Sequence, residues 1–279
     1  MLYIKNHDIL ALLFMIENRL ISLHPKLAAT ADFFVSIVFL WLLSRIETVQ
    51  MTAVWFAARI GWWIFLTQIM YYPPYLDRFR HLVSLFIANA GVLPFLIFAD
   101  PSNILYARLA TIILSFVSFY LVPAEGDSLS VMEKPHRRWK FFMSLFGVAG
   151  IWLTLQALVA FQVITGYWTL GAIAGASFLT AAISALEWDE YGVKSKGLKF
   201  FVLLFLIFLT IAEIGGIVYL WPVGYFVSSF FITWVWFLVW LLFRFDLSET
   251  GIDWPRQRFF LISNLILMVA FLTFVVRWK

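Results

Sequence analysis

Residues 200–210 read FFVLLFLIFLT and residues 226–243 read FVSSFFITWVWFLVWLLF, with no charged residue in either stretch. A helix over either stretch is apolar around its whole circumference, which is typical of a helix surrounded by lipid or buried in a helix bundle. The whole chain shares this character, because 63% of its residues are hydrophobic and 13% are charged. Soluble proteins carry about a quarter charged residues. The chain is therefore predicted to be an integral membrane protein.

Nine apolar segments are long enough, at roughly 20 residues each, to cross a bilayer as helices. Their predicted bounds are 27–46, 51–70, 82–99, 103–122, 140–163, 167–186, 198–220, 224–243 and 259–276. Membrane β-barrels are excluded, because their strands are short segments of alternating hydrophobicity. The predicted fold is all-α, a polytopic membrane helix bundle of about nine transmembrane helices that forms a single domain over residues 27–279.

The N-terminal residues 1–26 precede the first predicted span and are expected to be a cytoplasmic amphipathic segment. The apolar run 9–16 is too short to cross roughly 30 Å of hydrocarbon. Charged and polar residues follow it at 17–19, without the small-residue cleavage site of a signal peptide. We therefore predict a helix that lies on the membrane surface.

The basic residues indicate the orientation of the chain. Excess Lys and Arg in short loops marks the cytoplasmic side of a membrane. Of the 20 Lys and Arg residues, 15 lie in the N-terminal tail and in the second, fourth, sixth and eighth connections. They are Lys5, Arg19, Lys26, Arg78, Arg80, Lys134, Arg137, Arg138, Lys140, Lys194, Lys196, Lys199, Arg244, Arg256 and Arg258. We therefore predict a multi-pass protein of the cell membrane, with its N-terminus cytoplasmic and its C-terminus outside.

The expected partners are the lipid bilayer and anionic lipid headgroups at the cytoplasmic face. The net charge of +4 does not indicate nucleic acid, because the basic residues are spread over five inner segments. A protein partner is left open.

Two charged residues, Arg59 and Glu213, are predicted to lie well inside spans. At 1.5 Å per residue, both are about 10–12 Å below the predicted outer boundary. Intramembrane charge is costly and generally paired, so we expect an ion pair, with Arg108 nearer the outer surface. The pair would form a solute- or ion-binding site or, alternatively, fix the register of two helices. Asn89 is a weaker binding candidate, because such amides usually hydrogen-bond between helices.

A weaker candidate site lies on the predicted cytoplasmic face, around His136, Glu187 and Asp189. Acids with a histidine could hold Mg²⁺ and a phosphate. Their spacing matches no known motif, and solvated charge beside the membrane is the simpler interpretation, so we predict no metal site. Asp32, near the cytoplasmic end of the first span, is likewise expected to reach back to water or to cap a neighbouring helix, with a functional role as the weaker alternative.

Missing residue types exclude several classes of function. Without cysteine there are no thiolate metal sites and no cysteine nucleophiles. A retinal Schiff base is excluded because no lysine lies in mid-span, and paired haem ligands are disfavoured because all four histidines fall at the cytoplasmic face. NTPase, zincin and hydrolase motifs are absent from the sequence. We therefore expect no cofactor.

Small residues predict two places of close helix packing. The sixth span carries Gly171 and Gly175 at a spacing of four, which favours a position in the centre of the bundle, with a dimer interface as the alternative. Gly215, close to Glu213, is expected to allow the close approach of another helix or of a ligand.

The favoured function is transporter-like, that is, non-enzymatic passage or binding of a small solute or lipid within the bundle, centred on Arg59 and Glu213. One alternative is a membrane-embedded enzyme that acts on a lipid-linked substrate around His136 and Glu187, with no catalytic residue assigned. Another is a scaffold subunit of a larger complex. The position of an open cavity distinguishes the three.

Overall fold

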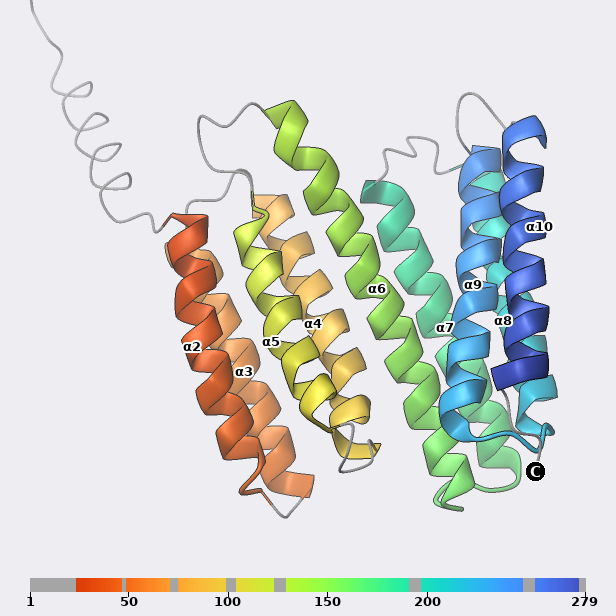
Figure 1. Ribbon diagram of the computed structural model, residues 1–279, viewed down its shortest axis with the longest axis horizontal. Coiled ribbons are helices and arrows are strands. Elements are labelled where there is room, and N and C mark those ends of the chain that lie inside the picture. The colour runs from red at the N-terminus through yellow and green to blue at the C-terminus, as the bar shows by residue number, and fades with distance from the viewer. Residues whose placement is uncertain are drawn as a thin grey trace, which may run out of the picture. The chain divides into compact units, whose positions relative to one another are not determined.

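The computed structural model describes residues 24–46, 49–70, 75–98, 104–122, 129–190, 197–247 and 254–275 (Figure 1). Every secondary-structure element in these segments is a helix, and the predicted all-α class is confirmed. The predicted surface segment over residues 1–26 lies almost entirely outside the described residues.

Nine long helices within the described segments lie where the nine spans were predicted. They are α2 (Pro25–Leu43), α3 (Val49–Ile69), α4 (Tyr75–Phe98), α5 (Ile104–Tyr120), α6 (Leu129–Ala160), α7 (Tyr167–Glu190), α8 (Leu198–Tyr219), α9 (Tyr225–Leu247) and α10 (Trp254–Ala270), which a short π-helix, η1 (Phe271–Val275), continues.

The surfaces of these helices are those of a membrane protein. Seven of the described helices are long and apolar enough to span a bilayer; α5 is shorter, with 17 residues, and α3 is not among the seven. Large apolar side chains stay exposed along the helices, among them Phe34 (62%), Val54 (64%) and Phe205 (58%). Exposed apolar surface on this scale requires lipid around it. The chain is therefore a multi-pass integral membrane protein.

The helix α6 begins earlier than its predicted span. The span was expected from residue 140, but the helix starts at Leu129, so much of the predicted loop 123–139 is helical. Similarly, α4 starts at Tyr75 and not at residue 82. Charged side chains end an apolar segment without ending a helix, because a helix makes its backbone hydrogen bonds internally wherever it lies.

The described helices form two compact units. The first contains α2, α3, α5 and the parts of α4 and α6 up to residues 89 and 143. The second contains α7 to α10 and the remaining parts of α4 and α6. The single domain predicted over residues 27–279 stays a prediction.

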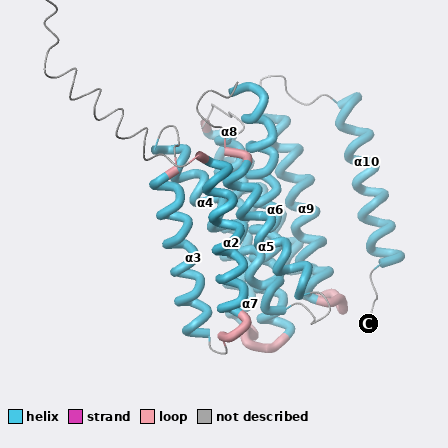
Figure 2. Tube along the Cα trace, turned by 60° about the vertical axis from the view of Figure 1, so that its left-hand side comes forward, coloured by secondary structure: helices cyan, strands magenta, loops and turns pink. Residues whose placement is uncertain are grey.

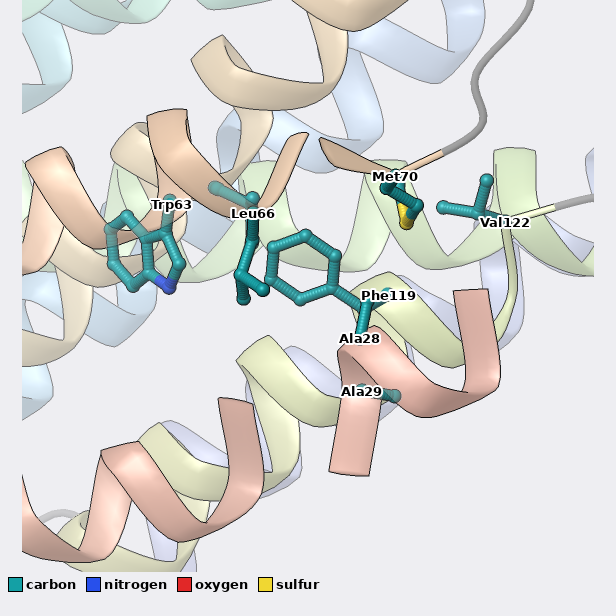
Figure 3. Close-up of a cluster of buried hydrophobic side chains, with 8 residues drawn as sticks. Ala28, Ala29, Trp63, Leu66, Met70, Phe119 and Val122 are labelled. Carbon is teal, nitrogen blue, oxygen red and sulfur yellow. The ribbon is translucent and has the colours of Figure 1, made fainter. Parts of the chain in front are cut away.

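A buried apolar cluster joins α2, α3, α4 and α5 within the first unit (Figure 3). Its members are at most 2% exposed and are Ala28, Ala29, Trp63, Leu66, Met70, Leu85, Phe119 and Val122. Leu66 of α3 lies beside Phe119 of α5 (Figure 3). The two alanines let α2 approach closely, because they carry nothing beyond Cβ. The cluster thereby packs four helices together.

Glycine allows a close helix contact in the second unit. A Cβ on Gly91 of α4 would lie 2.2 Å from the carbonyl oxygen of Phe146 in α6, and one on Gly150 would lie 2.2 Å from Cα of Gly91. Gly171 and Gly175 of α7 instead have nothing within 4 Å of such a Cβ. The expected close approach at Gly171 and Gly175 is therefore wrong, although α7 does lie among α6, α8 and α9 of its unit, in agreement with a central position.

The prediction for Gly215 is confirmed, and the conformation of Gly166 explains why a glycine stands there. A Cβ on Gly215 would meet the ring of Trp152 at 2.7 Å, so this glycine does allow a close approach. Gly166, in the turn between α6 and α7, has φ of 60°, the left-handed conformation that glycine adopts without strain.

Figure 2 draws the last long helix, α10, to one side of the other helices of its unit, and side chains of α9 contact it. The Trp234 indole donates to Oδ1 of Asn264 at 3.2 Å. The rings of Phe230 and Phe271 lie 5.1 Å apart between centroids. The remaining surface of α10 is largely exposed, as expected of a helix at the edge of its unit.

Candidate functional site

A buried ion pair joins α2 to α3 in the first unit. The guanidinium Nη2 of Arg59 lies 3.3 Å from Oδ1 and 3.4 Å from Oδ2 of Asp32. The side chain of Arg59 is 2% exposed and that of Asp32 is 0% exposed. Two opposite charges are therefore enclosed between helices of a membrane protein, where each alone would be costly.

The Asp32 carboxylate accepts three further hydrogen bonds. The indole N–H groups of Trp62 and Trp63 donate to Oδ1 at 3.1 and 3.2 Å. The hydroxyl of Ser36 donates to Oδ2 at 3.3 Å. The tryptophans lie three and four residues after Arg59, so one face of α3 presents all three donors to the same carboxylate.

The Arg59 guanidinium also reaches the third helix of the unit. Its Nη2 donates to the hydroxyl of Ser36 on α2 and, at 3.1 Å, to that of Ser115 on α5. The charge lies 4.8 Å from the ring centroid of Trp63 and 5.2 Å from that of Phe39, within the range of cation–π attraction. Nη1 is buried and has no hydrogen-bond partner among the described residues. We call these residues (Asp32, Phe39, Ser36, Arg59, Trp62, Trp63 and Ser115) the Asp32–Arg59 site.

Arg59 was expected to pair with Glu213, and this pairing is corrected to Asp32. Glu213 lies on α8 in the second unit and its side chain is exposed. The prediction compared the depths of backbone positions. A guanidinium, however, lies several ångströms from its own Cα, so the depth of the Arg59 backbone does not specify which acid the side chain reaches.

The prediction for Asp32 was also wrong, because this carboxylate does not reach back to water. A sequence signal for it was available. Ala28, Asp32, Ser36 and Leu40 follow at intervals of four, and all four are buried. Small and polar side chains on one face of an apolar helix indicate a face turned toward other helices.

The other candidates from the sequence do not join this site. Asn89 is buried and its amide donates to the carbonyl of Leu85 in its own helix at 2.9 Å. Arg108 is half-buried on α5, seven residues before Ser115 and hence about 10 Å along the axis. A ligand-binding role for Arg59, Glu213, Arg108 or Asn89 stays a prediction.

His136 lies inside the first unit and not on its surface. It is 8% exposed, and its ring stacks on that of His81, which is 0% exposed, with 5.9 Å between the centroids. The ring of Phe119 meets His81 edge-on at 5.3 Å. The sequence placed both histidines at the cytoplasmic face and did not predict their burial, because both lie beside charged residues.

The acidic candidates of the cytoplasmic face lie in the second unit. Glu187 is 3% exposed and accepts a hydrogen bond from Ser144 at 2.5 Å. Asp189 belongs to α7, but its side chain is outside the description. The described residues contain no group of three His, Cys, Asp or Glu side chains that could hold a metal ion. A joint site of His136, Glu187 and Asp189 stays a prediction.

The second unit also contains two separate neutral pairs of buried polar side chains. The indole of Trp152 on α6 donates to the Thr180 hydroxyl at 3.2 Å, and that of Trp236 on α9 donates to the Ser184 hydroxyl at 2.8 Å. Thr180 and Ser184 lie one turn apart on α7. These bonds tie α6, α7 and α9 together, and we assign no chemistry to them.

Comparison with models of known protein families, with curated proteins and with solved structures finds no match to this chain. The proposal that follows therefore depends on the geometry of the Asp32–Arg59 site.

Proposed function

We propose that the protein passes a small anion together with a proton through its first unit, and that the Asp32–Arg59 site binds both. The observation that carries this proposal is the enclosed pair of charges between α2, α3 and α5. Charged residues in membrane helices are rare and generally belong to pathways for ions, protons or substrates.

The neutrality of the pair explains why a proton and an anion would move together. Protonation of Asp32 leaves the charge of Arg59 uncompensated in a buried place, which costs at least about 2.5 kcal/mol on membrane insertion scales. A small anion that binds the guanidinium restores neutrality. By linkage, anion binding equally favours protonation of Asp32.

The guanidinium has capacity for such an anion. Its Nη1 lacks a hydrogen-bond partner among the described residues. Ser36 and Ser115 carry hydroxyls next to Nη2 that could turn toward an anion. Trp62 and Trp63 would hold the carboxylate in place while the guanidinium changes partner. Passage further requires that the enclosed site opens to each side of the membrane in turn.

The test uses liposomes that contain the purified protein and a pH-sensitive dye. Inward gradients of chloride, nitrate or sulfate are imposed, with gluconate as the control anion and the membrane potential clamped to zero. At least one small anion should acidify the lumen faster than in protein-free liposomes. Rates equal to those of protein-free liposomes for every anion would contradict the proposal.

Substitutions at Asp32 and Arg59 distinguish a role in transport from a role in stabilising the fold. Asp32→Asn should lower anion-driven proton uptake at least tenfold, because the carboxylate that carries the proton is gone. The matched control is Asp246→Asn, which removes an exposed carboxylate on α9 and should keep the wild-type rate. The double variant Asp32→Leu with Arg59→Met should fold and be inactive. If it folds and is fully active, the site has no role in transport.

A further inference from the structure

A groove opens between α2 and α5 on the surface of the first unit. It has a volume of about 320 Å³ and is lined by Thr30, Phe33, Phe34, Ile112, Ile113 and Phe116. This volume is near the lower end of ligand pockets, which span roughly 300–1,000 Å³. Its walls are apolar throughout. The Thr30 hydroxyl does not change this, because it donates to the carbonyl of Lys26 in its own helix at 2.9 Å.

One end of the groove carries a positive charge. The ammonium of Lys26, one turn before Thr30, lies 5.8 Å from the ring centroid of Tyr120. The ring of Tyr120 stacks on that of Phe116 at 5.7 Å, and Phe116 meets Phe33 at 6.0 Å. Contacts therefore run without a break from an exposed ammonium to the wall of the groove.

The groove and the ammonium are placed as the acyl chain and the headgroup of a bound lipid would require. Lys26 lies in the first turn of α2 and Tyr120 is the last residue of α5, so both mark the end of the unit that the sequence places at the cytoplasm. From there the groove extends along α2 toward Phe34 and, in the opposite chain direction, along α5 toward Ile112. An acyl chain takes this course from a headgroup into the hydrocarbon of the bilayer.

We propose that this groove is a binding site for one anionic phospholipid, with an acyl chain against the phenylalanines and the headgroup phosphate at Lys26. The charge decides the class of lipid. A single ammonium attracts a headgroup of net negative charge, and anionic lipids are enriched in the cytoplasmic leaflet. The site is separate from the Asp32–Arg59 site and does not depend on the proposed transport.

The experiment counts lipids that stay bound to the delipidated protein in native mass spectrometry. Dioleoylphosphatidylglycerol is compared with dioleoylphosphatidylcholine, which has the same chains and no net charge. The wild-type protein should retain one phosphatidylglycerol at least threefold more than phosphatidylcholine. Lys26→Gln should abolish this preference, and Ile113→Trp, which fills the groove, should lower the retention of both lipids at least threefold.

Two control variants isolate the groove from general effects. Lys199→Gln removes an exposed ammonium from α8, and Ile266→Trp enlarges an exposed side chain on α10. Both should bind lipid as the wild type does. Because Lys26 and Ile113 are exposed, their variants should also keep the wild-type melting temperature.

Four outcomes would overturn the proposal. The first is equal retention of the two lipids by the wild type. The second is an equal loss of phosphatidylglycerol in Lys199→Gln, which would indicate a general charge effect. The third is displacement of the bound phosphatidylglycerol by glycerol phosphate, which carries the phosphate but has no acyl chain. The fourth is a dimer mass that Ile113→Trp converts to monomer, which would make the groove an interface between two copies of the chain.

Discussion

The two units bury polar side chains between their helices in different ways. In the first unit, four side chains converge on one carboxylate, that of Asp32, and the guanidinium of Arg59 links it to a third helix. In the second unit, the indoles of Trp152 and Trp236 each meet one hydroxyl of α7, and the buried carboxylate of Glu187 accepts from the single hydroxyl of Ser144. A shared network couples the energies of its members, whereas separate pairs contribute independently.

This difference shows what the charged site adds beyond support of the fold. Neutral hydrogen bonds between membrane helices contribute on average about 0.6 kcal/mol each, and two of them join α7 to α6 and α9. An intramembrane charge costs about 2.5–3.5 kcal/mol on insertion scales before any partner offsets it. A pair that served only to join helices could therefore be neutral, and the charge at Asp32 favours a role in binding.

The largest effect is expected when one charge of the first unit is removed. Asp32→Leu should lower the free energy of unfolding by about 3–5 kcal/mol, because it leaves the buried guanidinium of Arg59 uncompensated. Unfolding in detergent, followed by circular dichroism, measures the change. The double variant with Arg59→Met should recover most of the loss. Equal losses in the single and double variants would show that the two charges are not coupled.

The second prediction concerns the glycine contact of the second unit. Gly91→Ala should destabilise the protein by about 1–3 kcal/mol, because its methyl group would overlap the backbone of α6 at Phe146. Gly175→Ala is the matched control in a helix interior where the methyl group meets open space, and it should be neutral or slightly stabilising. Melting temperatures of the two variants provide the comparison. A tolerated alanine at residue 91 would contradict the close approach.

The positions of the helices could be predicted from the sequence because each depends on local composition. An apolar segment of about 20 residues specifies a spanning helix without reference to its neighbours. The starts of α4 and α6 were misplaced for a related reason. Hydropathy reports where the lipid ends, whereas Tyr75 and Leu129 mark where the backbone hydrogen bonds begin.

The candidate site could be predicted only in part. Arg59 stands out as an isolated charge in an apolar segment, and the structure does enclose it. Its partner depends on which helices are neighbours and on where a long side chain ends, and neither is a local property. The same limit explains the misassigned contact of Gly171 and Gly175, because a pattern of small residues permits close packing without specifying the helix that packs there.

The third prediction measures one neutral pair of the second unit. Thr180→Val should cost about 0.6 kcal/mol and at most about 1.7 kcal/mol, because it removes the acceptor of the Trp152 indole and little volume. A double-mutant cycle with Trp152→Phe isolates the pair from the packing of the ring. A coupling energy as large as that between Asp32 and Arg59 would remove the distinction between the units.

The smallest effect is expected at the exposed ion pair of the second unit. Nζ of Lys199 lies 3.0 Å from Oδ2 of Asp246, which is closer than the 3.3 Å between Arg59 and Asp32. These side chains are, however, 60% and 38% exposed. Water therefore screens the attraction between the two charges and solvates each of them when the pair is broken. Lys199→Ala should therefore change the free energy of unfolding by no more than about 0.5 kcal/mol.

The change should vanish in 1 M salt, where the screening length falls to about 3 Å, while the effect of Asp32→Leu should persist. Unfolding of both variants at low and high salt tests whether burial, and not distance, sets the strength of the two pairs. An equal loss of unfolding free energy in Lys199→Ala and Asp32→Leu would show that burial does not set the strength of the pairs.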